Sequence, residues 1–112
     1  MFKLASSERF WALVKVEYQR EEGGRGTAAF NVQYRRLPIP RVKALFEENT
    51  GAENADLKTM QEIVCDWKNV TDEEGAEIPF SQDELVKLYN MGFGSPVVKL
   101  FFSFFPQAKE KN

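Results

Sequence analysis

Two short segments in which apolar and polar residues alternate constrain the fold of this 112-residue chain more than any other feature. Apolar side chains stand at every second position of both segments: Val14, Val16 and Tyr18, then Phe30, Val32 and Tyr34. A period of two places the apolar side chains of a strand on one face. Because an isolated β-hairpin is only marginally stable in water, the rest of the chain or a partner must cover that face.

The glycines between the two segments supply the turn of this hairpin. Gly23, Gly24 and Gly26 tolerate the backbone conformations that tight turns need. A turn centred near Gly24 predicts three cross-strand pairs: Tyr18 with Phe30, Val16 with Val32, and Val14 with Tyr34. A phosphate-binding loop is the weaker interpretation of these glycines, because they lie within a hairpin and not between a strand and a helix.

Helical spacing begins after Pro38 and Pro40, which end the strand region. Apolar residues then recur every three to four positions. Four short helices are predicted from this spacing, with these limits: near Pro40 to Gly51, near Ala55 to Trp67, near Gln82 to Gly92, and Ser95 to Pro106.

Local signals mark the starts of two of these helices. Ser81 and Glu84 form a capping-box pattern, with Phe80 and Leu85 placed as a hydrophobic staple. Asn54 or Asp56 is a suitable cap for the second helix. The predicted fold is α+β, a small antiparallel N-terminal hairpin followed by a bundle of about four short helices. We expect a single domain over residues 1–112, with the hairpin at about 9–37, the helical part at about 38–106 and a polar tail at 107–112.

Charge is segregated along the chain although the net charge is only -2. Residues 1–43 carry nine Lys/Arg and four Asp/Glu, residues 44–85 carry two and twelve, and residues 86–112 carry four and one. Such blocks favour complementary packing between the ends and the middle, or association of copies of the chain. They argue against a general nucleic-acid binder, which would be basic over the whole domain.

Composition leaves few routes to catalysis. The chain has no His, which excludes imidazole bases and most zinc sites. Cys65 is expected on a buried helix as a structural thiol. The acidic segment 72–77 lacks the alternating oxygen ligands of a calcium loop, so a solvated turn is the preferred interpretation. We therefore expect no cofactor, no metal and no enzymatic activity, and we expect Trp11 and Trp67 to be core anchors.

The phenylalanine-rich segment 101–105 is the strongest sign of a binding function. Its side chains point around more than half of a helix, so a small core cannot easily cover all of them. Exposed apolar surface marks interaction sites. The predicted partner-binding residues are Phe101, Phe102, Phe104, Phe105, Tyr89 and Met91. In the alternative interpretation, Phe101 and Phe105 face the core while Phe102 and Phe104 fold beneath the hairpin.

A basic cluster offers a second candidate surface for an anionic partner. It consists of Arg35, Arg36, Arg41 and Lys43. These residues are placed to touch phosphates or an acidic protein. The alternative is a solvated strand end that balances the acidic middle of the chain.

Two segments resemble the tail assembly chaperones of long-tailed bacteriophages and prophages. Residues 30–37 are similar to the F-x-V-x-F/Y-x-R-L strand of that family. Residues 63–88 are similar to its W-x-x-V-x-D-E-x-G-x-x-x-P-F-S-x-x-x-L segment, with Asp66 where the family often has glycine. The motifs are structural and not catalytic.

The resemblance implies a non-enzymatic protein that binds the tape-measure protein and helps to recruit tail-tube subunits. We also expect the protein to form a homo-oligomer and to lie in the bacterial host cytoplasm. No membrane-spanning segment is expected, because the apolar window near residues 96–105 is far shorter than the roughly 20 residues of a membrane-spanning helix. The alternative function is a small phage or bacterial regulator that binds nucleic acid through the basic cluster.

Overall fold

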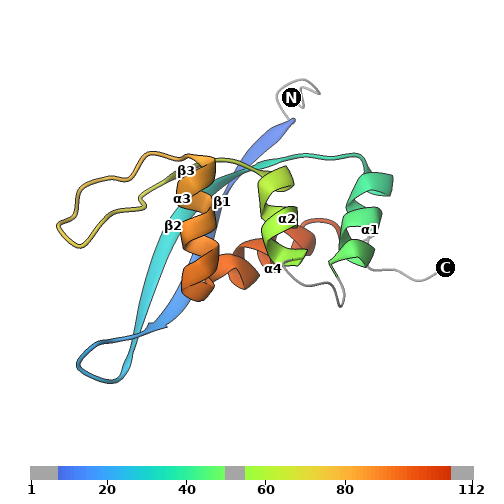
Figure 1. Cartoon of the computed structure of the whole chain (residues 1–112). Coiled ribbons are helices and arrows are strands. Elements are labelled where there is room, and N and C mark those ends of the chain that lie inside the picture. Colours follow the sequence, from blue (N-terminus) through green and yellow to red (C-terminus); the bar gives the residue numbers. More distant parts are fainter. Residues whose placement is uncertain (1–7, 50–54, 107–112) are drawn as a thin grey trace.

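The sheet at the centre of the structure has three antiparallel strands in the order β1-β2-β3 (Figure 1). The structure is a computed structural model that describes residues 8–49 and 55–106. Strand β1 spans Arg9–Gln19, β2 spans Arg25–Arg35 and β3 spans Val64–Lys68. The predicted α+β class and N-terminal hairpin are confirmed.

The predicted face of the hairpin is correct, but the predicted register is wrong by four residues. Val14 lies opposite Phe30, and Tyr18 lies opposite Gly26. The turn is centred earlier than expected, because the backbone N–H of Gly23 donates to the carbonyl of Arg20 at 3.1 Å. A shift by an even number of residues leaves every side chain on the same face, so five of the six predicted apolar side chains are still buried, and only Tyr18 near the turn is exposed.

Strand β3 was predicted as the end of a helix. Helix α2, Ala55–Ile63, stops before it, and β3 begins at the next residue. Gln33 pairs with Asp66 while Tyr34 pairs with Val64, so Cys65 is an extra residue in a β-bulge. The bulge brings Val64 and Trp67 to the buried face although they are three residues apart, a spacing that imitates a helix.

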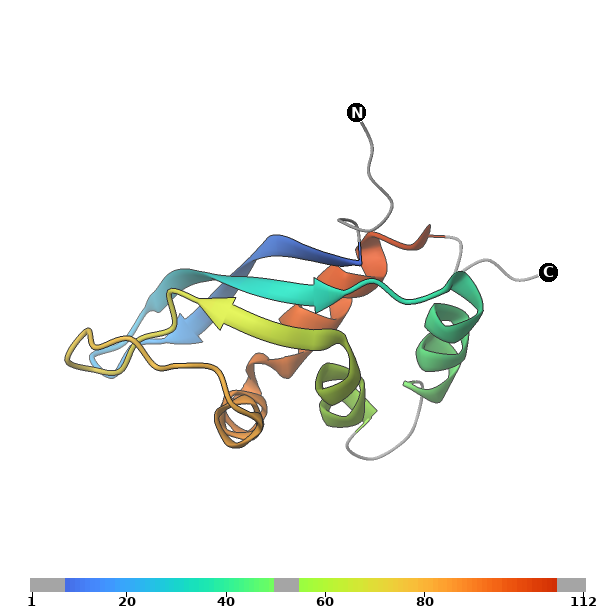
Figure 2. The same ribbon diagram turned by 90° about the horizontal axis from the view of Figure 1, so that it is seen from above.

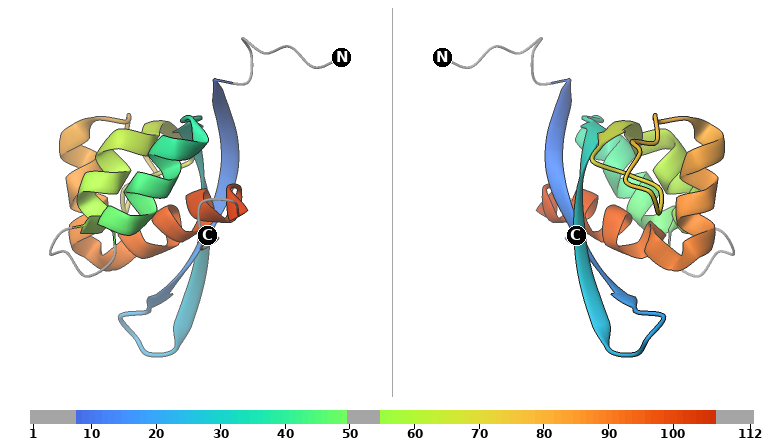
Figure 3. Two further views of the ribbon diagram at one scale, coloured as in Figure 1. Left: turned by 90° about the vertical axis from the view of Figure 1, so that its right-hand side faces the viewer. Right: turned by 90° about the vertical axis from the view of Figure 1, so that its left-hand side faces the viewer.

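The remaining helical segments are α1 at Ile39–Glu48, α3 at Gln82–Leu88, the π-helical turn η2 at Tyr89–Phe93 and α4 at Gly94–Ser103. The described residues contain three helical runs and not the predicted four, because α3 continues through η2 into α4 with a kink at Gly92, where φ is 92°. The helices lie on one side of the sheet and do not form a separate bundle (Figure 3). Gly51, Asn54 and the predicted polar tail lie outside the described residues.

Helix α4 passes beneath the sheet and reaches the start of β1 (Figure 2). Its contact with β2 joins the two layers: the Tyr34 hydroxyl donates to the Val97 carbonyl at 2.7 Å, and the Tyr34 and Phe101 rings lie 5.4 Å apart. Burial raises the pKa of Tyr34 because the ionised phenolate would lose its hydration. The polar tip of an otherwise apolar core residue is therefore satisfied by the helix beneath it.

A second group of contacts fixes the long connection between β3 and α3. The Trp67 ring N–H donates to the Ile78 carbonyl at 2.7 Å, and Phe80 packs edge-on against the Trp67 ring at 5.3 Å. The Ser81 hydroxyl accepts from the Glu84 backbone N–H at 3.1 Å, which confirms the predicted cap. Trp67 is thus a core anchor, as expected.

Replacing Tyr34 with Phe should lower the free energy of unfolding by about 1 kcal/mol, because it removes one buried hydrogen bond while keeping the ring. Urea unfolding of the two proteins measures this difference. Tyr18→Phe is the matched control. Because Tyr18 is exposed, removing its hydroxyl should change the free energy of unfolding by less than about 0.5 kcal/mol. Equal effects at the two positions would contradict the assigned role of the Tyr34 hydroxyl.

Candidate interaction surface

Most of the phenylalanine-rich segment lies in the core. Phe101, Phe102 and Phe105 are buried, which corrects their placement on an accessible surface. Phe101 contacts the rings of Phe102 and Phe105 at 5.5 and 5.0 Å, and Phe102 packs edge-on against Phe46 of α1 at 5.3 Å. The sheet packs against one side of α4 and α1 packs against another, so the core covers more of these side chains than expected.

The other three predicted partner-binding residues differ in exposure and position. Met91 is 70% exposed and Phe104 is 47% exposed, whereas Tyr89 is half-buried and packs over Gly94. Met91 lies in η2 before α4, and Phe104 lies directly after α4. Since the whole of α4 separates them, these two exposed side chains do not form one patch.

Phe104 lies beside the start of the edge strand β1. Its ring contacts Phe10 at 5.2 Å, and the Arg36 guanidinium lies 4.9 Å from the centre of the Phe10 ring. Arg36 also lies 5.8 Å from the Phe105 ring. A cation over an aromatic face is attracted by the ring quadrupole. The exposed ring of Phe104 therefore extends an ordered aromatic cluster toward the β1 edge.

The side of the sheet opposite the helices also exposes apolar residues. Trp11 is 39% exposed and Leu13 is 49% exposed, so Trp11 is not the core anchor that was predicted. The Lys68 ammonium lies 4.2 Å from the centre of the Trp11 ring, across the width of β2. In the part of the chain that the structure describes, no helix covers this side (Figure 3). We call it the open face.

The outer edge of β1 adjoins the open face. The backbone carbonyl of Glu8 accepts from the Arg36 N–H at 2.7 Å, and the backbone N–H of Arg20 donates to the Gly24 carbonyl at 3.0 Å. Because hydrogen-bonded positions alternate along an antiparallel pair, the even-numbered residues of β1 bond to β2. The peptide groups of the odd-numbered residues point away from the sheet. Over residues 8–49 and 55–106, no strand pairs with them. Trp11 and Leu13 are among these odd-numbered residues.

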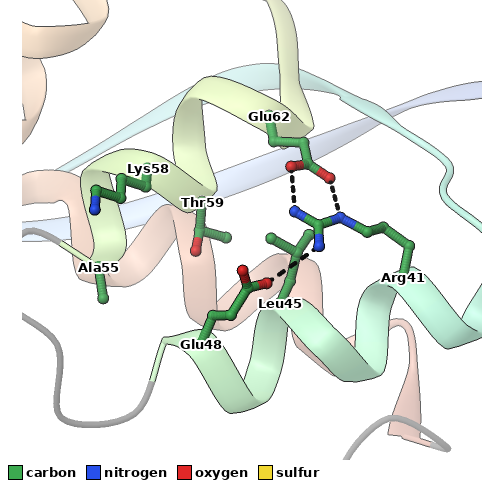
Figure 4. Close-up of a pocket in the computed structure, with 7 residues that line it drawn as sticks. All are labelled: Arg41, Leu45, Glu48, Ala55, Lys58, Thr59 and Glu62. Carbon is green, nitrogen blue, oxygen red and sulfur yellow. Dashed lines mark hydrogen bonds and ion pairs between the residues drawn. The ribbon is translucent and has the colours of Figure 1, made fainter.

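Arg41 of the predicted basic cluster is held in a joint between α1 and α2 (Figure 4). Its Nε and Nη2 each donate to the Glu62 carboxylate at 2.7 Å, and Nη1 donates to Glu48 at 3.2 Å. The hydrogen bond to Glu62 raises the pKa of Arg41, and the same bond lowers the pKa of Glu62. These groups line a pocket of about 400 Å³ together with Leu45, Ala55, Lys58 and Thr59.

The four residues of the basic cluster are therefore not one free cationic patch. Arg41 is neutralised by Glu62 and Glu48, Arg36 lies over Phe10, and Lys43 is half-buried on α1. Arg35 is exposed at the end of β2 and contributes to the low pKa of Glu62. Two ion pairs, Arg41 with Glu62 and Arg41 with Glu48, join the basic N-terminal segment to the acidic middle segment, which is one of the two arrangements that the charge segregation predicted.

The acidic segment forms a turn, and Cys65 lies in the bulge of β3. The Asp72 carboxylate accepts from the backbone N–H groups of Glu74 and Ala76 at 2.9 and 3.0 Å. Cys65 is half-buried, on a strand and not on the expected helix. The described residues hold no group of three His, Cys, Asp or Glu placed to bind a metal ion. They also include no helix with the length and apolarity to cross a membrane.

We find no match for the chain among protein-family models, curated protein sequences or solved structures.

Glu62→Gln should destabilise the protein near neutral pH and much less in acid. Because the Glu62 pKa in the folded state lies below its ordinary value of 4.5, the carboxylate contributes full stability above that pH and loses it as the pH falls through the folded-state pKa. Urea unfolding of the wild-type protein and the variant near pH 7 and about pH 3 measures whether the difference between their free energies of unfolding shrinks in acid.

Glu48→Gln is the control for this prediction, since Glu48 makes a single, longer contact with Arg41 at 3.2 Å and is more exposed. Its effect near neutral pH should be smaller. A stability difference for Glu62→Gln that stays constant from pH 7 to about pH 3 would show that the ion pair is not its cause.

Proposed function

We propose that the protein is a non-catalytic phage or prophage tail assembly chaperone that binds the tape-measure protein and assists tail-tube assembly. The observation that carries this proposal is the pairing of the two segments that resemble the family. Val32 lies opposite Trp67 in the sheet, and Trp67 in turn is held by Ile78 and Phe80. The two distant motifs thus form one folding unit, which supports a shared fold as their origin.

The surface we assign to the tape-measure protein consists of Trp11 and Leu13 on the open face and Phe104 beside the β1 edge. These are three of the large apolar side chains that the described structure leaves exposed. A tape measure is a long, apolar, helix-prone chain that must be kept soluble. Exposed aromatic and aliphatic anchors bind the apolar face of such a helix, and several weak contacts along a long chain add up when copies line up on it.

Co-expression with the tape-measure protein of the same genome tests this assignment. Wild-type chain should keep the tape measure soluble and co-purify with it, and the double variant Trp11→Ser/Phe104→Ser should lose most of that capture. Burial of each side chain against the tape measure should contribute roughly 1.5 to 3 kcal/mol to the free energy of binding. The double variant should therefore bind at least about a hundredfold more weakly.

Met91→Ser is the control, because Met91 is an even more exposed apolar side chain that lies at the opposite end of α4 from Phe104. It should leave capture unchanged. Urea unfolding should show that the double variant still unfolds in one cooperative transition, with a loss of about 1 to 3 kcal/mol because the contacts of Trp11 with Lys68 and of Phe104 with Phe10 are removed. Full capture by the double variant would contradict the assigned surface, and no capture by wild-type chain would contradict the proposed function.

A further inference from the structure

We infer that the outer edge of β1 pairs antiparallel with the same strand of a second copy of the chain, with Leu13 opposite Leu13. This pairing joins two three-stranded sheets into one continuous sheet about a two-fold axis. It goes beyond the proposed function, because it specifies which strand associates, in which register, and with what partner.

The hydrogen-bonding state of β1 is the first part of the argument. The strand is 11 residues long, contains no proline, and is bonded to β2 only through its even-numbered residues. Its odd-numbered residues direct N–H and C=O groups outward. A long edge strand with a row of free backbone groups is a template for pairing with another strand. Two such edges satisfy each other only when odd-numbered residues face odd-numbered residues.

Charge selects one register among those that meet this condition. Centring the pair on Leu13 places Arg9 opposite Glu17 of the second copy, and Trp11 opposite Lys15 of the second copy. Each pairing occurs twice because of the two-fold axis. An acid–base pair and a cation beside an indole ring are both favourable across neighbouring strands.

The neighbouring registers lose these contacts. A shift of two partner positions in one direction places Arg9 opposite Lys15, two like charges. The same shift in the other direction places Arg9 opposite Gln19 and Trp11 opposite Glu17. The strand is therefore complementary to itself in one register, which is why a second copy fits the edge better than an unrelated extended peptide.

The contacts already present leave these side chains available. Glu17 bonds to Arg25 at 3.4 Å, and both side chains are largely exposed, so this pair is weak. Trp11 contacts Lys68 of its own chain, and Lys15 is exposed. In the joined sheet, Trp11 and Leu13 of both copies form one apolar stripe across the open face. The backbone groups at the β1 edge join the two copies, and the side chains of Trp11 and Leu13 stay on the open face of the joined sheet.

Sedimentation equilibrium of the full chain tests the inference. Wild-type chain should be a dimer, and Arg9→Glu or Glu17→Arg alone should raise the dimer dissociation constant roughly tenfold or more, because each places like charges opposite one another twice. The double variant Arg9→Glu/Glu17→Arg restores opposite charges and should recover most of the affinity. All of these positions are exposed, so the variants should fold.

Arg25→Ala is the matched control, since it removes the partner of Glu17 within the chain but no contact across the dimer. It should leave the dissociation constant within about threefold of wild type. A wild-type chain that remains a monomer up to about 1 mM contradicts the inference, and an edge that binds only other extended polypeptides would give this result. A dimer whose double variant is no stronger than the single variants contradicts the register.

Discussion

The contact between α4 and the apolar face of the hairpin is the constraint on which the rest of the structure depends. A two-stranded hairpin with a fully apolar face is not stable in water alone. Phe101 and the Tyr34 ring meet near the open end of the hairpin, where Tyr34 lies opposite Phe10, and the Tyr34 hydroxyl donates to the Val97 carbonyl in the same helix as Phe101. The phenylalanine-rich segment is therefore occupied in holding the two layers together.

This use of α4 leaves the two sides of the sheet unequal. On one side, the helices, the Trp67 contacts and the Arg41–Glu62 joint fix a closed layer. On the other side, Trp11 and Leu13 remain accessible beside an edge strand with free backbone groups. Over the described residues, the sheet is thus packed against helices on one side and carries exposed apolar side chains on the other, beside unpaired backbone groups at the β1 edge.

The sequence was sufficient for the elements that depend on local patterns. Alternation identified the buried face of the hairpin, and the Ser81 cap marked the start of α3. The register was not predictable from the same pattern, because alternation fixes only whether a shift is even, and several glycines could end the turn. Strand β3 was missed because its bulge at Cys65 gives Val64 and Trp67 a helical spacing.

The exposed apolar side chains were harder to predict, since exposure depends on how the sheet and the helices pack against each other. Phe101, Phe102 and Phe105 are as apolar as Phe104, and only the packing of α1 and the sheet against α4 separates them. Trp11 belongs to a strand, but it is one of the odd-numbered residues of β1, whose side chains face away from the helices. Trp11 was assigned to the core because tryptophan is usually buried. Its position in the strand, which decides the face on which its side chain lies, predicts the opposite.

Hydrogen exchange of the β1 backbone amides, followed by NMR at increasing protein concentration, tests directly whether copies of the chain associate through the outer edge of β1. The amides of Ala12 and Val14 bond to β2 and should be protected at every concentration. The amides of Trp11, Leu13 and Lys15 should exchange quickly in dilute solution and become protected as the concentration rises. Fast exchange of these three amides at all concentrations, in a chain that nevertheless associates, would show that β1 does not pair with a second copy.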